Sequence, residues 1–160
     1  MSRKRSWSPK GQPDHVREDR GGKIMTLLAA TSCFGVELFI LIEGNVNSPW
    51  WCYFISEIWK TVVPKMVKRN PGMKKEDILL LYDNCSSHVS GFSGWWMRNL
   101  NCYKLTICPY TPEFNPIELL FNSLKWRASD NVARTSLLSL TEFLAWNMNE
   151  IPQKTFVGYF

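Results

Sequence analysis

The chain has 160 residues, of which 45% are hydrophobic and 21% are charged, as in folded globular domains. This composition excludes an intrinsically disordered chain, and eight Trp residues indicate extensive side-chain packing. The longest apolar stretch, residues 33–42, contains Glu37 and is too short to cross a bilayer. We therefore expect one soluble, intracellular domain with no membrane partner.

The first 22 residues form a basic, irregular lead-in without a hydrophobic period, and the folded domain is expected over residues 23–160. Residues 1–23 hold seven basic and three acidic residues, which account for most of the formal net charge of +5. Such a segment attracts phosphate without reading sequence. A solvated basic tail with no ligand explains the same composition equally well.

The five Cys residues are odd in number, contain no C-x-x-C pair and lie mostly inside apolar runs. We therefore expect reduced thiols in the core and no disulfide framework. The chain has two His residues, His15 and His88, so no Cys/His zinc quartet at finger-like spacing can be drawn.

The first half of the domain predicts a hairpin followed by a long helix. Residues 24–34 and 36–42 are short apolar runs separated by Gly35, as in two antiparallel strands. Residues 49–68 place large apolar side chains at helical spacing, and Pro64 is expected to kink or end that helix.

The second half alternates apolar runs with helical patterns. Residues 78–82 form a continuous apolar run, which predicts a strand buried on both faces. The elements expected after it are a short helix over 91–100, a buried strand over 104–108, a rigid turn over 109–112, and helices over 115–127 and 139–149. A hairpin followed by alternating strands and helices predicts a three-layer α/β domain with a mixed sheet.

Two acidic residues stand where elements are expected to begin or end. Asp83 directly follows the run 78–82, at the carboxyl end of a buried strand, where ligands gather in open α/β sheets. An acid at that position more often forms a turn or caps a helix. Glu118 closes the stretch Asn115-Pro116-Ile117-Glu118, which also spells a helix capping box. Each acid alone therefore has a purely structural explanation.

The two acids together belong to a more specific pattern. Asp-Asn-Cys-Ser-Ser-His over residues 83–88 is followed by Pro-Tyr-Thr-Pro-Glu-Phe-Asn-Pro-Ile-Glu over 109–118, with 34 residues between the two acids. This pairing resembles the second and third acidic motifs of mariner-type DDE transposases of the Tc/mariner superfamily. Weaker similarity extends to Trp-Ser-Pro-Lys-Gly over 7–11 and Val-Gly-Tyr-Phe over 157–160, so it covers nearly the whole chain.

The resemblance implies an RNase H-like fold and metal-dependent cutting and joining of DNA at transposon ends. Asp83 and Glu118 would be catalytic carboxylates that bind Mg²⁺ or Mn²⁺, because anionic oxygens suit these hard cations. Asn84, His88 and Asn115 are candidates for orienting these ligands or contacting substrate. DNA is the implied partner, the nucleus is the expected location, and a homodimer stays open.

The same resemblance predicts a gap in the sheet. The family carries its first catalytic Asp on the first, central strand, upstream of the Trp-x-Pro-x-Gly segment, whereas Trp7 lies six positions after Met1. We expect an amino-terminally truncated domain without this strand, with unpaired backbone groups on its neighbours and activity near background. The alternative is a non-enzymatic transposon relic or adopted domain that binds DNA or protein.

Overall fold

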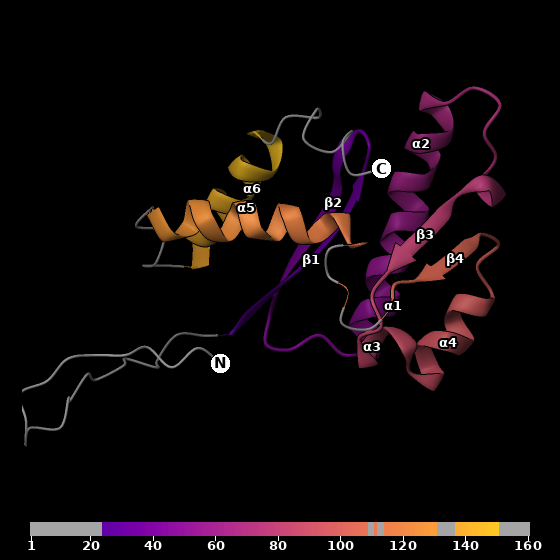
Figure 1. Ribbon diagram of the computed structural model, residues 1–160, viewed down its shortest axis with the longest axis horizontal. Helices are drawn as coiled ribbons and strands as arrows, with labels where there is room; N and C mark the ends of the chain where they lie inside the picture. Colours follow the sequence, from indigo (N-terminus) through magenta and orange to yellow (C-terminus); the bar gives the residue numbers. More distant parts are fainter. Residues whose placement is uncertain (1–23, 109–110, 112–113, 131–136, 151–160) are drawn as a thin grey trace, which may run out of the picture.

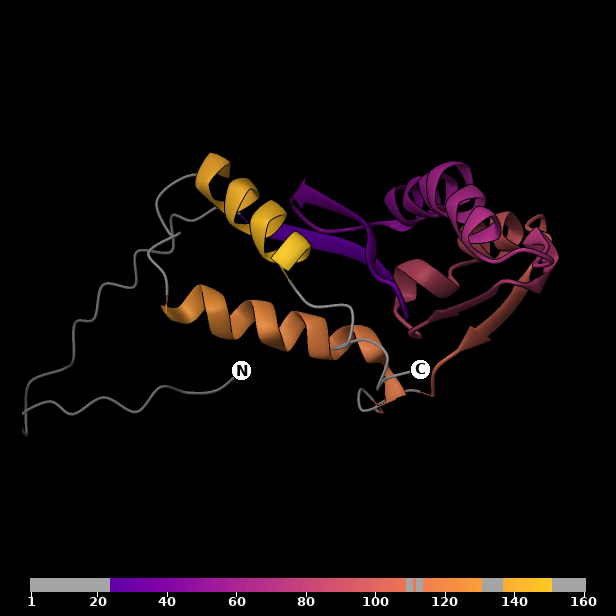
Figure 2. The same ribbon diagram turned by 90° about the horizontal axis from the view of Figure 1, so that it is seen from above.

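The computed structural model describes residues 24–108, 111, 114–130 and 137–150, so the lead-in over 1–22 and most of the turn over 109–112 lie outside the described residues. The β1–β2 hairpin lies between two groups of helices (Figure 1, Figure 2). No described helix is long and apolar enough to cross a membrane. In chain order the elements are β1 (Met25–Ser32), β2 (Gly35–Glu43), α1 (Ser48–Glu57), the π-helical η1 (Ile58–Val62), α2 (Val63–Arg69), the 3₁₀ turn η2 (Lys75–Asp77), β3 (Leu79–Tyr82), α3 (Ser86–Val89), α4 (Gly91–Arg98), β4 (Tyr103–Thr106), α5 (Pro116–Asp130) and α6 (Leu137–Glu150).

The predicted hairpin is confirmed. β1 and β2 pair antiparallel from Met25 opposite Glu43 to Ser32 opposite Gly35. Gly35 closes the turn with a φ of 118°, a value that residues with a side chain rarely adopt. Because side chains of a strand alternate between its two faces, this hairpin presents one apolar face to each helix layer.

The two faces of the hairpin build two hydrophobic clusters. Leu28 and Ile42 join the cluster formed around α1, η1 and the start of α2, where Phe54 and Ile55 are almost fully buried. The opposite face packs against α5 and α6, and Leu27 contributes to that second cluster. Figure 2 shows the hairpin between these two helix groups. The sheet is therefore the middle layer of three, as predicted.

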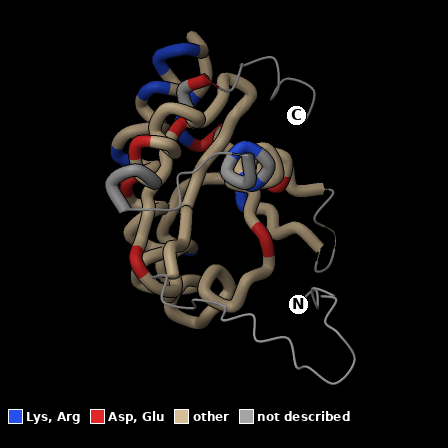
Figure 3. The backbone as a smooth tube through the Cα atoms, turned by 90° about the vertical axis from the view of Figure 1, so that its left-hand side faces the viewer, with Lys and Arg blue, Asp and Glu red and all other residues tan. Residues whose placement is uncertain are grey.

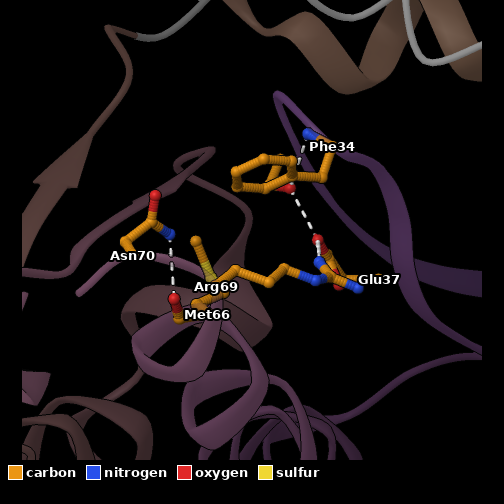
Figure 4. Close-up of polar contacts among 6 residues, drawn as sticks. Phe34, Glu37, Met66, Arg69 and Asn70 are labelled. Atoms are coloured by element: carbon orange, nitrogen blue, oxygen red, sulfur yellow. Dashed lines mark hydrogen bonds and ion pairs between the residues drawn. The ribbon is translucent and has the colours of Figure 1, made fainter.

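A β-bulge ties the hairpin to the end of α2. The register shifts after Ala30, which leaves Glu37 as the extra residue of β2. The Glu37 carboxylate accepts from Ser32 Oγ at 2.7 Å and from Arg69 Nη1 at 2.6 Å (Figure 4). The Arg69 guanidinium also lies 5.3 Å from the centre of the Phe34 ring. These contacts fix the turn of the hairpin against the α1–α2 layer.

The long helical segment continues past the proline expected to kink or end it. Asn47 caps the start of α1, because its side chain accepts from Trp50 N at 3.1 Å. Pro64 lies in the first turn of α2, directly after η1, and the helix runs on to Arg69. The missing proline N–H is tolerated there because the wider π-helical turn before it has already interrupted the regular hydrogen-bond ladder.

The prediction that the next two strands are buried on both faces is wrong. β3 and β4 pair parallel, and one face, which includes Leu80, packs against the α1 cluster. On the other face Leu79, Tyr103 and Leu105 are 55%, 67% and 53% exposed. The α5–α6 layer covers the hairpin and stops short of this face (Figure 2). Among the described strands the mixed sheet is thus split into two pairs, β1–β2 and β3–β4.

The expectation of core thiols holds for one of the five Cys residues. Cys52 is buried, and burial raises the pKa of its thiol, an effect partly offset by the hydroxyl of Ser93 at 3.9 Å. Cys102 is partly buried, and desolvation raises its pKa too. All five are free, and the other three are exposed: Cys33, Cys85 and Cys108. The apolar runs in the sequence did not distinguish strand ends from the core.

This difference predicts selective alkylation of the native chain. At neutral pH, iodoacetamide should modify Cys52 at least about tenfold more slowly than Cys33 or Cys85, because Cys52 is buried and its raised pKa leaves less thiolate. Peptide mass spectrometry of timed samples measures each site. The difference should vanish in urea, and equal rates in the native chain would contradict this placement of α1.

Candidate functional site

A cavity of about 310 Å³ lies between the two strand pairs. Residues 27–31 of β1 line one side of the cavity. The other side is lined by all four residues of β3 and by Asp83, which follows it. The start of α5 contributes 115–118. Four of the five site residues expected from the sequence therefore line one cavity: Asp83, His88, Asn115 and Glu118.

Asp83 follows the last residue of β3 and turns the chain toward α3. Its Oδ1 accepts a hydrogen bond from Cys85 N at 3.2 Å, an Asx turn of the kind that the structural explanation predicted. The side chain remains 51% exposed, and Oδ2 has no partner among the described residues. Turn formation therefore uses one carboxylate oxygen and leaves the other available to a ligand.

His88 lies close to the same carboxylate on a second side. Its Nδ1 lies 2.6 Å from Asp83 Oδ1, and its side chain is only 14% exposed. The imidazole stacks on Trp51 with the ring centres 3.7 Å apart and an angle of 27° between the planes. Tyr82 meets its edge at 6.3 Å. A ring packed in this way cannot rotate freely, so the imidazole stays beside the Asp83 carboxylate, although its Nδ1 makes no hydrogen bond among the described residues.

Glu118 lies in the first turn of α5, but the predicted capping box is incomplete. Asn115 is the residue before the helix, and its Oδ1 accepts from Ile117 N at 3.4 Å while its carbonyl accepts from Glu118 N at 3.0 Å. The Glu118 carboxylate makes no reciprocal bond to Asn115 N and has no partner within the described ranges. Asn115 thus starts the helix, and Glu118 is left free to bind a cation at the cavity.

Two further residues near Asp83 differ in how they lie relative to the cavity. Asn84 is exposed and does not line the cavity, so the expectation that it orients Asp83 has no support in the described contacts. Trp51 was assigned to the core from its place in an apolar helix, and it is indeed 6% exposed. Its stacking on His88 gives it a second role that no local sequence signal carries.

The donors at this cavity suit a hard divalent cation. Carboxylate oxygens and an amide oxygen are the ligands that Mg²⁺ and Mn²⁺ prefer. Asp83 and Glu118 supply the charge, and Asn115 supplies a neutral oxygen at the same cavity. The described residues contain no group of three or more acidic, His or Cys side chains that could hold a metal ion by themselves. These side chains are therefore of the right chemical kind for a Mg²⁺ or Mn²⁺ site, but the described residues supply fewer ligands than such an ion needs.

The family comparison agrees with this geometry. The profile of the DDE superfamily endonucleases matches residues 1–139, which is most of the chain. The chain therefore belongs to the DDE superfamily endonuclease family, as its paired acidic motifs predicted. No significant match was found among curated proteins.

Solved structures of a mariner transposase share the fold. The catalytic domain of Mos1 mariner transposase superposes with a TM-score of 0.74 at 18% identity, over 84% of this chain and 66% of that one. The Mos1 catalytic domain with raltegravir and Mg gives 0.75 at 20%, over 88% and 70%. The Mos1 paired end complex with Mn gives 0.73 at 21%, over 99% and 46%.

At these identities the likeness shows the fold, and it confirms the predicted RNase H-like class. The chain spans from about half to about two thirds of the length of these structures.

The His88 contact predicts a positioning effect on metal binding. His88→Ala should weaken Mn²⁺ binding about 10- to 100-fold, because the Asp83 carboxylate loses the group that orients it. Isothermal titration measures the affinity, and circular dichroism checks that the variant folds. Trp51→Phe keeps a ring against His88 and should retain most of the affinity. Unchanged Mn²⁺ affinity in folded His88→Ala would remove this role.

Proposed function

We propose that this domain carries out the metal-dependent DNA strand cleavage and strand transfer of DNA transposition, with Asp83 and Glu118 as two of its carboxylate ligands. One observation carries the proposal: acids 34 residues apart, one after β3 and one in the first turn of α5, open onto the same cavity. The Mos1 structures with Mg, with Mn and with a transposon end support it. A location in the nucleus, where DNA is the substrate, follows from the same proposal.

The chain's own residues would bind and orient the reactants. Paired divalent ions, when bound, hold attacking and leaving oxygens of a phosphodiester in line. Asp83 and Glu118 would hold Mg²⁺ or Mn²⁺, and His88 would keep the Asp83 carboxylate turned toward the cavity. The cavity wall described here carries these two carboxylates and no third. We therefore propose that the described residues alone support cleavage only near background.

Lys125 is the basic residue best placed to contact DNA beside this site. It lies seven residues after Glu118 on α5, which is two helical turns on the same side, about 10 Å along the axis. Its side chain is exposed, and Figure 3 views α5 nearly end-on with its basic segment in sight. Phe121, between them on the helix, lines the cavity. A phosphate adjacent to one held at the cavity would therefore lie within reach of this face.

Removal of either carboxylate tests the metal site. Asp83→Asn and Glu118→Gln should each weaken Mn²⁺ binding by about tenfold or more, because each removes an anionic oxygen ligand. Glu142→Gln, an exposed acid on α6, is the matched control and should bind as the unmodified chain does. Equal affinities in all four proteins would contradict the proposal and favour the non-enzymatic alternative.

Nicking of supercoiled DNA in Mn²⁺ tests the activity directly. The 160-residue chain should nick near background. Strong nicking that disappears in Asp83→Asn would refute the expected inactivity while supporting the site.

DNA binding by the α5 face has its own test. Binding to duplex DNA should weaken steeply with salt, and Lys125→Gln should reduce the logarithmic salt slope by about one. Lys68→Gln is the matched control, since Lys68 is also exposed and lies near the end of α2, away from α5 (Figure 1). Fluorescence anisotropy over a salt series measures both slopes. A larger effect in Lys68→Gln would place the DNA on the α2 side.

A further inference from the structure

Four exposed aromatic side chains lie on the neighbouring helices α1 and α4, which pack against each other. Trp50 and Tyr53 are three residues apart on α1, and Phe92 and Trp95 are three residues apart on α4, so each pair shares one side of its helix. In chain order the four side chains are 41%, 49%, 54% and 60% exposed. Single exposed apolar residues are normal, whereas a contiguous group of them marks an interaction site.

Two side-chain contacts define the seam between α1 and α4. Ser48 Oγ lies 2.7 Å from Ser90 Oγ, and Cys52 Sγ donates to Ser93 Oγ at 3.9 Å. The second contact lies further along both helices than the first. The two helices therefore run in the same direction where they meet.

This packing turns the two aromatic pairs to the same side of the seam. Successive residues of a helix are turned by about 100° about its axis. Tyr53 follows Cys52, and Phe92 precedes Ser93, so their side chains turn away from the seam in opposite senses on the two helices. Because the helices are parallel and face each other, opposite senses bring both rings to one side. We call the four aromatic side chains on this side the aromatic face.

The polar side chains around the aromatic face already have partners within the protein. Three of them donate to backbone carbonyls: Ser56 Oγ to Cys52 O at 2.9 Å, Ser93 Oγ to Ser87 O at 2.5 Å and Asn99 Nδ2 to Trp95 O at 3.0 Å. Covering a polar group is costly when it loses water and gains no partner. These donors avoid that cost, so the aromatic face can be covered without leaving them unpaired.

Charge indicates what covers the aromatic face. Residues 44–56 and 84–97 contain no Asp, Glu, Lys or Arg, whereas residues 58–75 hold six basic residues and no acidic one. Two copies related by a two-fold axis bring the same surface together, so a surface with a net charge repels its own copy. The aromatic face has no such charge. A nucleic acid is a poorer occupant, because its phosphates need cations that these segments lack.

The area is also suitable for the centre of a dimer contact. An aromatic side chain has a surface of about 150–250 Å², so four half-exposed rings present about 400 Å² together. A standard interface covers about 800 Å² on each partner, with aromatic residues enriched at its centre and polar residues at its rim. The aromatic face would therefore supply about half of such an interface.

We propose that the aromatic face is the surface through which two copies of this chain associate about a two-fold axis, without metal or DNA. The Trp50 and Tyr53 rings already meet edge to face at 5.8 Å, so little order is lost when they are covered. Glu57, one helical turn after Tyr53, pairs with Lys60 at 3.0 Å, which keeps the rim neutral. No residue of the aromatic face lines the cavity, so this contact does not depend on the proposed transposition activity.

Sedimentation velocity of the full 160-residue chain tests the association. Between about 1 and 100 µM, the metal-free chain should shift from monomer to dimer. Phe92→Glu should weaken the dimer at least about tenfold, because it places two carboxylates in an apolar contact. Trp146→Glu is the matched control, since Trp146 is an exposed ring on α6, and it should leave the dimer unchanged. Circular dichroism checks that both variants fold.

A mixture of two charge variants separates loss of contact from loss of folding. Phe92→Lys alone should weaken the dimer as Phe92→Glu does. Fluorescently labelled Phe92→Lys mixed with unlabelled Phe92→Glu should associate at least about tenfold more tightly than either variant with itself, because opposite charges then meet. A misfolded variant would not be repaired by mixing. Equal association in the mixture and in the single variants would contradict the proposed contact.

Two other results would overturn the proposal. A chain that stays monomeric up to about 100 µM would leave the aromatic face to a different protein. Dissociation by Trp146→Glu with an intact dimer in Phe92→Glu would place the contact on α6. The double variant Asp83→Asn with Glu118→Gln should dimerise as the unmodified chain does, so failure of the metal site and failure of this interface can be told apart.

Discussion

The whole arrangement depends on the alternation of side chains along one hairpin. Because Leu28 faces one side and Leu27 the other, β1 and β2 must be covered by helices on both faces. The α1–α2 layer covers the first and the α5–α6 layer the second. This requirement places α5 against β1, and the start of α5 then lies at the cavity into which β3 ends. The meeting of two acids distant in sequence is thus a consequence of packing.

Much of the fold could be predicted from the sequence because the patterns that indicate its elements are local. Gly35 between two apolar runs indicated the hairpin, and Asn115-Pro116 indicated the start of α5 to the residue. The acidic motifs were specific as a pair, and the structure places Asp83 and Glu118 at one cavity although each alone had a structural explanation; their role as metal ligands stays a prediction. Sequence reasoning also identified His88, whose contact with Asp83 the structure describes.

The features that could not be predicted from the sequence depend on contacts between elements that are distant in the chain. The run 78–82 predicted burial on both faces, yet Leu79 is 55% exposed because α5 and α6 cover the hairpin alone. Pro64 does not end the helix, because the π-helical turn before it accommodates the proline and the helix runs on to Arg69. The hydrogen bond that Asp83 accepts comes from the backbone of Cys85, a partner set by the turn that the chain makes there, while the role of Asn84 stays a prediction. Neither local propensity nor hydrophobic period contains this information.

Trp51 joins the interior of the protein to its functional surface. The same indole packs against Phe54 in the buried cluster and stacks on the imidazole that lies beside Asp83. The direction in which an acidic group points at the cavity is therefore set by how well the interior is packed. Evolution of this domain cannot freely exchange large interior residues near α1, since a change made for stability alone would reach the chemistry through one shared ring.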